Sequence, residues 1–177
     1  MNASNSCIAI YPPSSEEREA LPRVIKELLS LDYPSDKLSV IGKGSLLEEK
    51  AIGIVMTKDK LTYKGEQEAF WHSLWDLISG EAFFMMPELG SLAMAGGVST
   101  LLLDEDTGTF DYQDYSELGR ALHQLGVPKS NVKYYETLIK AGQVILVVQG
   151  NYQDIEKAGE LVELSKKDVE VSLHFSS

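Results

Sequence analysis

Two patterns in the sequence have side chains of the type that bind metal ions. The histidines, His72, His123 and His174, stand far apart and lack the close spacing of a zinc-binding set. The acidic stretch that begins at Asp104 resembles part of a calcium loop. Its glycine comes fifth instead of sixth, and its twelfth residue, Tyr115, replaces the required glutamate. The sequence therefore predicts no metal site and no cofactor.

Signals for catalysis are equally sparse. The chain has no G-x-S-x-G elbow, no P-loop and no dinucleotide-binding glycine motif. Its single cysteine, Cys7, excludes an internal disulfide and begins a strand-like segment, where a thiol serves as a small hydrophobic side chain. One set of aromatic and acidic residues could line a pocket between a sheet and helices. It comprises Tyr63, Trp71, Tyr134, Tyr135 and Glu136.

The chain that must position these residues has 177 residues, which is the size of one domain. The formal net charge of −11 argues against a nucleic-acid partner. Residues 66–127 hold one Lys or Arg and 11 Asp or Glu, a net charge of −10, so this segment carries nearly the whole imbalance. A compositional shift of this size predicts a module inserted into a charge-balanced domain.

Both ends of the chain read as β-α-β units. Strands are predicted at residues 7–11, 38–41, 143–149 and 169–175, with a helix between the members of each pair. Residues 51–57 add a strand that we expect to form a hairpin with 38–41. The prediction is an α+β fold: a ferredoxin-like β-α-β sandwich with an antiparallel sheet. Residues 1–65 and 141–177 are its halves, and residues 66–140 are a helical insertion.

The insertion contains the apolar surface that we expect to act. Helices are predicted near 66–79, 118–125 and 132–139, and residues 89–103 are a run of 15 uncharged residues. That run is short for a membrane span, and its small residues repeat every fourth position, which lets two helices pack closely. The residues expected at an interface with another copy are Phe70, Trp71, Leu74, Trp75, Ser91, Ala95 and Ser99.

Three stretches carry a resemblance to a known family. They are Ala9–Pro12 with Leu38–Gly42, the segment Gly53–Gly96 with its Ala69-Phe70-Trp71 and Ala82-Phe83-Phe84 motifs, and Gly126–Lys129 followed by Tyr135-Glu136. Together they resemble the bacterial general stress protein 17M-like family, also called heat-induced stress proteins. The resemblance implies a stress-associated protein of unknown biochemical function and supplies no catalytic residues. Related proteins are often labelled as membrane proteins.

Polar and charged residues interrupt the apolar middle of this chain, and they favour a soluble form. They are His72, Ser73, Asp76, Glu81 and Glu88. The polar N-terminus lacks the basic and apolar regions of a signal peptide, so a cytoplasmic location is expected.

Three functions remain open. The first is non-enzymatic self-association or partner binding through the insertion, which makes a homo-oligomer. The second is peripheral membrane binding by residues 66–103, which the negative charge of that segment disfavours. The third is an enzyme or small-molecule binder, whose ligand the sequence leaves unknown.

Overall fold

A computed structural model describes residues 5–12, 20–43, 53–57, 60–64, 68–78, 82–86, 90–103, 116–165 and 169–175. Within them a six-stranded sheet has the order β5-β6-β2-β7-β1-β8, with every neighbouring pair antiparallel. Its strands are β1 (Asn5–Tyr11), β2 (Leu38–Lys43), β5 (Ala82–Met86), β6 (Gly90–Gly96), β7 (Val144–Gly150) and β8 (Glu170–His174). The structure thus confirms an α+β fold built on an antiparallel sheet.

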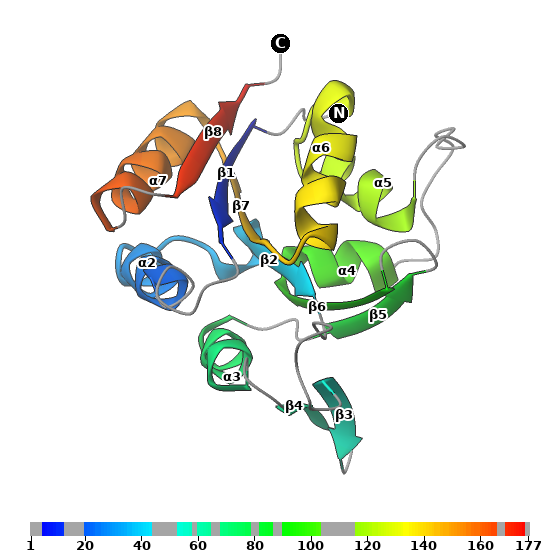
Figure 1. Cartoon of the computed structure of the whole chain (residues 1–177). Coiled ribbons are helices and arrows are strands. Elements are labelled where there is room, and N and C mark those ends of the chain that lie inside the picture. Colours follow the sequence, from blue (N-terminus) through cyan, green and yellow to red (C-terminus); the bar gives the residue numbers. More distant parts are fainter. Residues whose placement is uncertain are drawn as a thin grey trace.

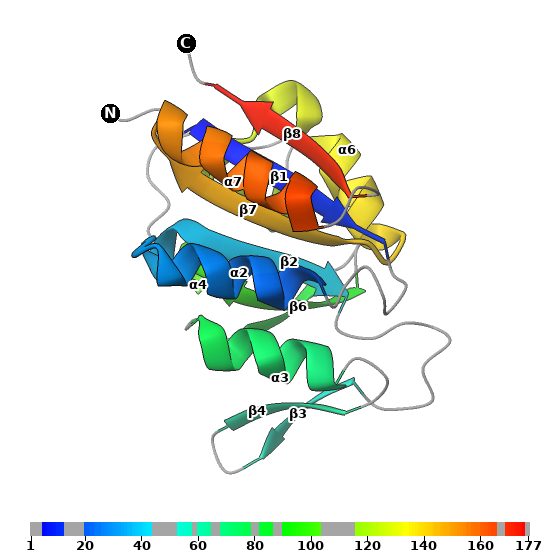
Figure 2. The same ribbon diagram turned by 90° about the vertical axis from the view of Figure 1, so that its left-hand side faces the viewer.

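Helices cover both faces of this sheet, which gives three layers (Figure 1). One face packs against α2 (Ala20–Ser30), α3 (Glu68–Leu77) and α7 (Tyr152–Ser165), which lie side by side in Figure 2. The other face packs against α4 (Gly97–Leu103), α5 (Glu117–Gln124) and α6 (Lys129–Lys140). A short 3-10 helix, η1 (Ser35–Lys37), precedes β2.

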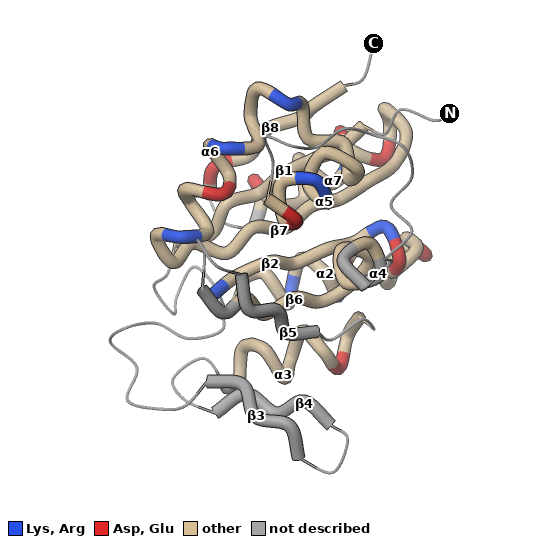
Figure 3. The backbone as a smooth tube through the Cα atoms, turned by 90° about the vertical axis from the view of Figure 1, so that its right-hand side faces the viewer, with Lys and Arg blue, Asp and Glu red and all other residues tan. Residues whose placement is uncertain are grey.

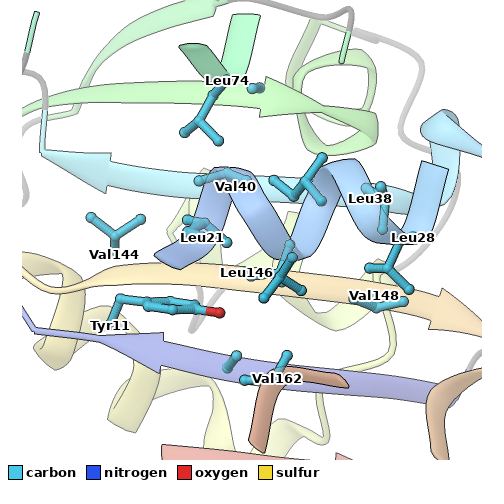
Figure 4. Packing of buried hydrophobic residues seen from close by; sticks show 14 of the residues in the cluster. Tyr11, Leu21, Leu28, Leu38, Val40, Leu74, Val144, Leu146, Val148 and Val162 are labelled. Atoms are coloured by element: carbon cyan, nitrogen blue, oxygen red, sulfur yellow. The ribbon is translucent and has the colours of Figure 1, made fainter. Parts of the chain in front are cut away.

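The inner strand β7 is apolar because both of its faces are buried. In β7, Val144, Leu146 and Val148 point into the core beneath α2 and α7 (Figure 4), whereas Ile145 and Val147 belong to the core beneath α5 and α6. A strand covered on both faces reads as a continuous hydrophobic run instead of an alternating one. The strand predicted at 143–149 is therefore confirmed.

The predicted hairpin between residues 38–41 and 51–57 is wrong. Strand β3 (Gly53–Thr57) pairs with β4 (Lys60–Lys64) in a separate two-stranded sheet. The neighbours of β2 are β6 and β7, both from later in the chain. A local hairpin partner was the simplest choice from sequence, but β2 is completed on both sides by distant strands.

The apolar run at 89–103 is not one helix. Residues 90–96 form β6, the chain turns at Gly96 with φ +91°, and α4 follows. The buried backbone N–H of Val98 donates to Oγ of Ser39 on β2 at 2.9 Å, which satisfies one donor in the first turn of α4. Strands β5 and β6 also show that the middle of the chain is mixed in structure, where helices alone were expected.

Several predicted helix boundaries are confirmed. Gly126 and Gly142 adopt φ values of +108° and +98° just after α5 and α6, a conformation that favours glycine. Asn151 caps α7, because its Oδ1 accepts the backbone N–H of Asp154 at 2.8 Å. The capping box expected at Ser14 and Glu17 lies outside the described residues.

Candidate functional site

Strand β8 ends the sheet on one side. In the described part of the chain it pairs with β1 alone, in a register that sets Ser172 opposite Ile8 and His174 opposite Ser6. Opposite residues of two strands share a face of the sheet. Ser172, Glu170 and His174 therefore lie on the face of α6, while Val171 and Leu173 pack on the core beneath α7.

Helix α6 places two tyrosines against this polar face of β8. Tyr135 is buried, and its hydroxyl lies 2.8 Å from Nε2 of His174, with the two rings edge to face at 5.9 Å. Tyr134 is 46% exposed, and its hydroxyl donates to the carboxylate oxygens of Glu170 at 3.2 and 3.3 Å. These two tyrosines with Glu170, Ser172 and His174 are called the β8 cluster below.

The electrostatics of the β8 cluster keep its central hydrogen bond neutral. Burial raises the pKa of the Tyr135 phenol, and burial lowers the pKa of the His174 imidazole. The side chain of Ser172 partly opposes this rise in the pKa of Tyr135 through a hydrogen bond with it.

The described contacts of Ser172 differ from those of a catalytic serine. A serine nucleophile needs a base that takes its proton. The described partner of Ser172 is the phenol of Tyr135, which is a very weak base, and Nε2 of His174 lies at hydrogen-bond distance from that same phenol. The described contacts of the β8 cluster therefore tie β8 to α6, and none of them pairs Ser172 with a base.

Most residues expected at an interface lie inside the chain instead. Trp71, Leu74 and Ala95 are fully buried in the core beneath α2 and α7, and Ser99 is buried as well. The apolar face of α3 closes the chain's own core, so these four side chains offer no surface to a second copy.

The other three expected interface residues differ. Trp75 is half-buried and donates its Nε1–H to the carbonyl of Met94 at 3.0 Å, and Phe70 packs partly buried on the same core. Ser91 lies on β6, and its side chain is outside the described set. In the described chain no helix is both apolar and long enough to cross a membrane.

The five residues expected to line a pocket are not brought together. Trp71 is in the core, and Tyr63 lies on β4 in the separate two-stranded sheet. Glu136 points to the start of α5, where its Oε1 accepts a hydrogen bond from Ser116 at 3.2 Å. A carboxylate at a helix N-terminus is stabilised by the helix dipole, so this residue has a structural role. Tyr134 and Tyr135 do share a site, the β8 cluster.

Sequence reasoning missed Glu170 and Ser172 as site residues and considered His174 only as a metal ligand. Their alternation with Val171 and Leu173 was the available signal, since it indicates that one strand face is polar. The described residues contain no group of three or more His, Cys, Asp or Glu that could hold a metal ion. No family model, curated protein or solved structure matches the chain.

Proposed function

We propose that this protein is a non-enzymatic binding module that takes up an extended strand of a partner at the open edge of β8. The observation that carries the proposal is that, among the described strands, β8 is hydrogen-bonded on one side only, while both faces of the sheet are covered by helices. An edge strand presents a row of unpaired backbone N–H and C=O groups, and strand addition to such an edge is a recurring mode of recognition.

The sequence of β8 supports this use of its edge. Proteins usually protect an open edge with proline, lysine or a β-bulge. The strand Glu170–His174 contains neither proline nor lysine, and its register with β1 runs through five consecutive pairs without a bulge. At its end Phe175 is 46% exposed and stacks on Tyr152 at 4.8 Å, which adds an aromatic surface beside the edge.

We infer further that β1-α2-β2 and β7-α7-β8 are the halves of a ferredoxin-like unit. The order β2-β7-β1-β8, antiparallel throughout, is the order expected for such a unit, and the intervening chain is then an insertion. The insertion supplies β5 and β6, which extend the sheet beyond β2. The sheet therefore has its second edge at β5, within the segment of net charge −10, and that charge repels most acidic partners.

The region around β8 is electrically much closer to neutral. Residues 128–177 hold six Lys or Arg and seven Asp or Glu, a net charge of −1. Figure 3 shows basic and acidic positions interspersed along α6. A partner strand approaching β8 consequently meets little long-range repulsion. The resemblance to heat-induced stress proteins sets the expected context, in which the module would act during stress.

Amide hydrogen exchange tests the proposal directly. Seven-residue peptides are selected from a displayed library on the immobilised protein, and exchange of the β8 amides is then followed by NMR with and without peptide. Alternate amides of β8 face β1 or point outward. Bound peptide is expected to protect the outward set and leave the other unchanged. Protection elsewhere on the protein, or failure to select any peptide, would contradict strand addition.

Proline substitutions supply a matched pair of variants. The amides of Ser172 and Leu173 are adjacent, so one points outward and the other bonds to β1. At the outward position proline leaves the β1 ladder intact, removes a donor offered to the partner, and is expected to abolish peptide binding without loss of stability. At the other position it is expected to lower stability. Equal binding by wild type and the outward proline variant would count against the proposal.

A further inference from the structure

We propose that the strand received at this edge is β8 of a second copy of this chain, in an antiparallel register that sets Ser172 opposite Ser172. This inference rests on the proposed strand addition and names its partner. The two six-stranded sheets would then join into one continuous sheet across a twofold axis. The homo-oligomer expected from sequence would form through β8 instead of the buried face of α3.

The geometry of antiparallel pairing restricts the possible registers. Residues directly opposite each other point to the same face and have the same hydrogen-bonding direction. In a twofold pair of identical strands the axis must therefore pass through a residue, not between two residues. An axis at Ser172 pairs all five residues of β8, whereas an axis one residue away pairs only three of them.

The central register also sets complementary side chains opposite each other. On the α6 face, the Glu170 carboxylate of each copy faces the His174 imidazole of the other, and the two Ser172 hydroxyls meet between them. On the α7 face, Val171 faces Leu173. An axis at Val171 would set Glu170 opposite Ser172, so the acid–base match is lost. Because the His174 imidazole is neutral near neutral pH, the match is a hydrogen bond, which an imidazole N–H can donate to the carboxylate of the other copy.

The register continues into an exposed aromatic residue. One position beyond β8, Phe175 of each copy would face Val169 of the other, since the two positions are equally far from Ser172. Phe175 is among the large hydrophobic residues exposed in the single chain, and Val169 belongs to the buried core. Pairing would thus place the exposed Phe175 ring next to apolar atoms. Along β8 the face toward α6 would remain polar and the face toward α7 would remain apolar, as in one copy.

Cysteine cross-linking measures this register, because the native thiol does not interfere. Cys7 is fully buried, and burial raises its pKa to about 12, so it is almost entirely unreactive thiol at neutral pH. Opposite residues in an antiparallel pair have Cα atoms about 4.5 to 5.5 Å apart, within the range of a disulfide. Ser172→Cys replaces one small side chain by another and is expected to cross-link to itself under mild oxidation.

The matched controls are Glu170→Cys and His174→Cys. Each thiol would lie about 13 Å along the strand from its own copy, too far for a disulfide. Each variant alone is expected to stay uncross-linked, while an equimolar mixture of the two is expected to give a covalent dimer. The proposed register would be overturned if Glu170→Cys formed a disulfide-linked dimer by itself. It would also be overturned if neither the mixture nor Ser172→Cys gave a covalent dimer.

Sedimentation velocity separates this inference from the proposed function. The wild-type protein is expected to show a concentration-dependent dimer. The substitution Glu170→Lys should weaken the affinity of the dimer about 5- to 30-fold, and adding His174→Glu to this variant should restore that affinity. A protein that stays monomeric at millimolar concentration, yet protects its outward β8 amides when a library peptide binds, overturns self-pairing and leaves strand addition standing. If the protein stays monomeric and no peptide protects the outward β8 amides, both proposals are overturned.

Discussion

The junction between β6 and α4 can be tested with one methyl group. At Gly96 a Cβ atom would overlap the carbonyl oxygen of Leu38 and lie 2.9 Å from its carbonyl carbon, a separation that real Cβ atoms essentially never show. Gly96 pairs with Ser39 in the ladder between β6 and β2, so neither backbone can move away without opening that ladder. We therefore predict that Gly96→Ala strongly destabilises the fold.

The magnitude follows from two contributions. An L-residue in the left-handed region costs about 1–2 kcal/mol, and loss of two ladder hydrogen bonds costs about 1 kcal/mol each. The expected loss is about 3–4 kcal/mol, a large fraction of the stability of a typical domain. Gly159→Ala on α7 is the matched control. Its Cβ would lie 3.3 Å from the flexible end of Leu173, and alanine in a helix contributes up to about 1 kcal/mol.

The assay is urea unfolding followed by circular dichroism, with the free energies of unfolding compared at equal m-values. Opposite signs are expected for the two glycine variants. A Gly96→Ala protein within about 1 kcal/mol of wild type would refute the described junction, because the overlap with the Leu38 carbonyl could not then exist. Similar losses in both variants would show that added volume, and not the backbone conformation at Gly96, determines the result.

Three further predictions use the same measurement. Leu74→Ala should cost about 2–5 kcal/mol because this side chain is fully buried, while Ser73→Ala on the exposed face of α3 should change stability by less than about 0.5 kcal/mol. Tyr135→Phe should lose about 1 kcal/mol with its hydrogen bond to His174, whereas Tyr11→Phe should be neutral or stabilising, because the buried Tyr11 hydroxyl has no partner among the described residues. Since the pKa of His174 is lowered in the fold, the unfolded chain takes up a proton first as the pH falls below about 6.5, so stability should fall there, and less so in His174→Gln.

Some elements of the fold can be predicted from the sequence because their signals are local. The run 143–149 has no polar face, which indicates an inner strand, and it is β7. Glycine after an apolar helical face predicts a helix end, and Gly126 and Gly142 both adopt positive φ at those ends. Each of these features depends on residues a few positions apart, so one chain is enough to read them.

The middle of the fold could not be predicted in the same way. Ala93 and Ala95 fit a helical ridge of small residues, but they also fit alternate positions of a strand. In β6 the residues from Leu92 to Ala95 are buried on both faces, so the alternation that identifies a strand is missing. What makes this segment a strand is its pairing with β2, whose residues lie 49 to 57 positions earlier than their partners, and pairing over that distance leaves no local pattern.

The candidate site has the same origin. Tyr135 was expected to line a pocket with residues such as Tyr63 and Trp71, yet its hydroxyl lies beside His174, 39 positions later. That contact depends on three long-range arrangements: β8 beside β1, the register that sets Ser172 opposite Ile8, and α6 across the same face. A change of one residue in register would turn Ser172 and His174 toward α7 and place Val171 and Leu173 beside Tyr135.

The same register connects the site to the proposed function. Both helical layers bury apolar faces of the sheet in this chain's own cores, so association through those faces would require the cores to open. An edge needs no such opening, because its backbone groups already point outward. Tyr135 and His174 hold β8 in the register that orients this edge, and Glu170 stays at the surface beside Tyr134. In the proposed function, the β8 cluster therefore fixes which side chains a partner strand would meet.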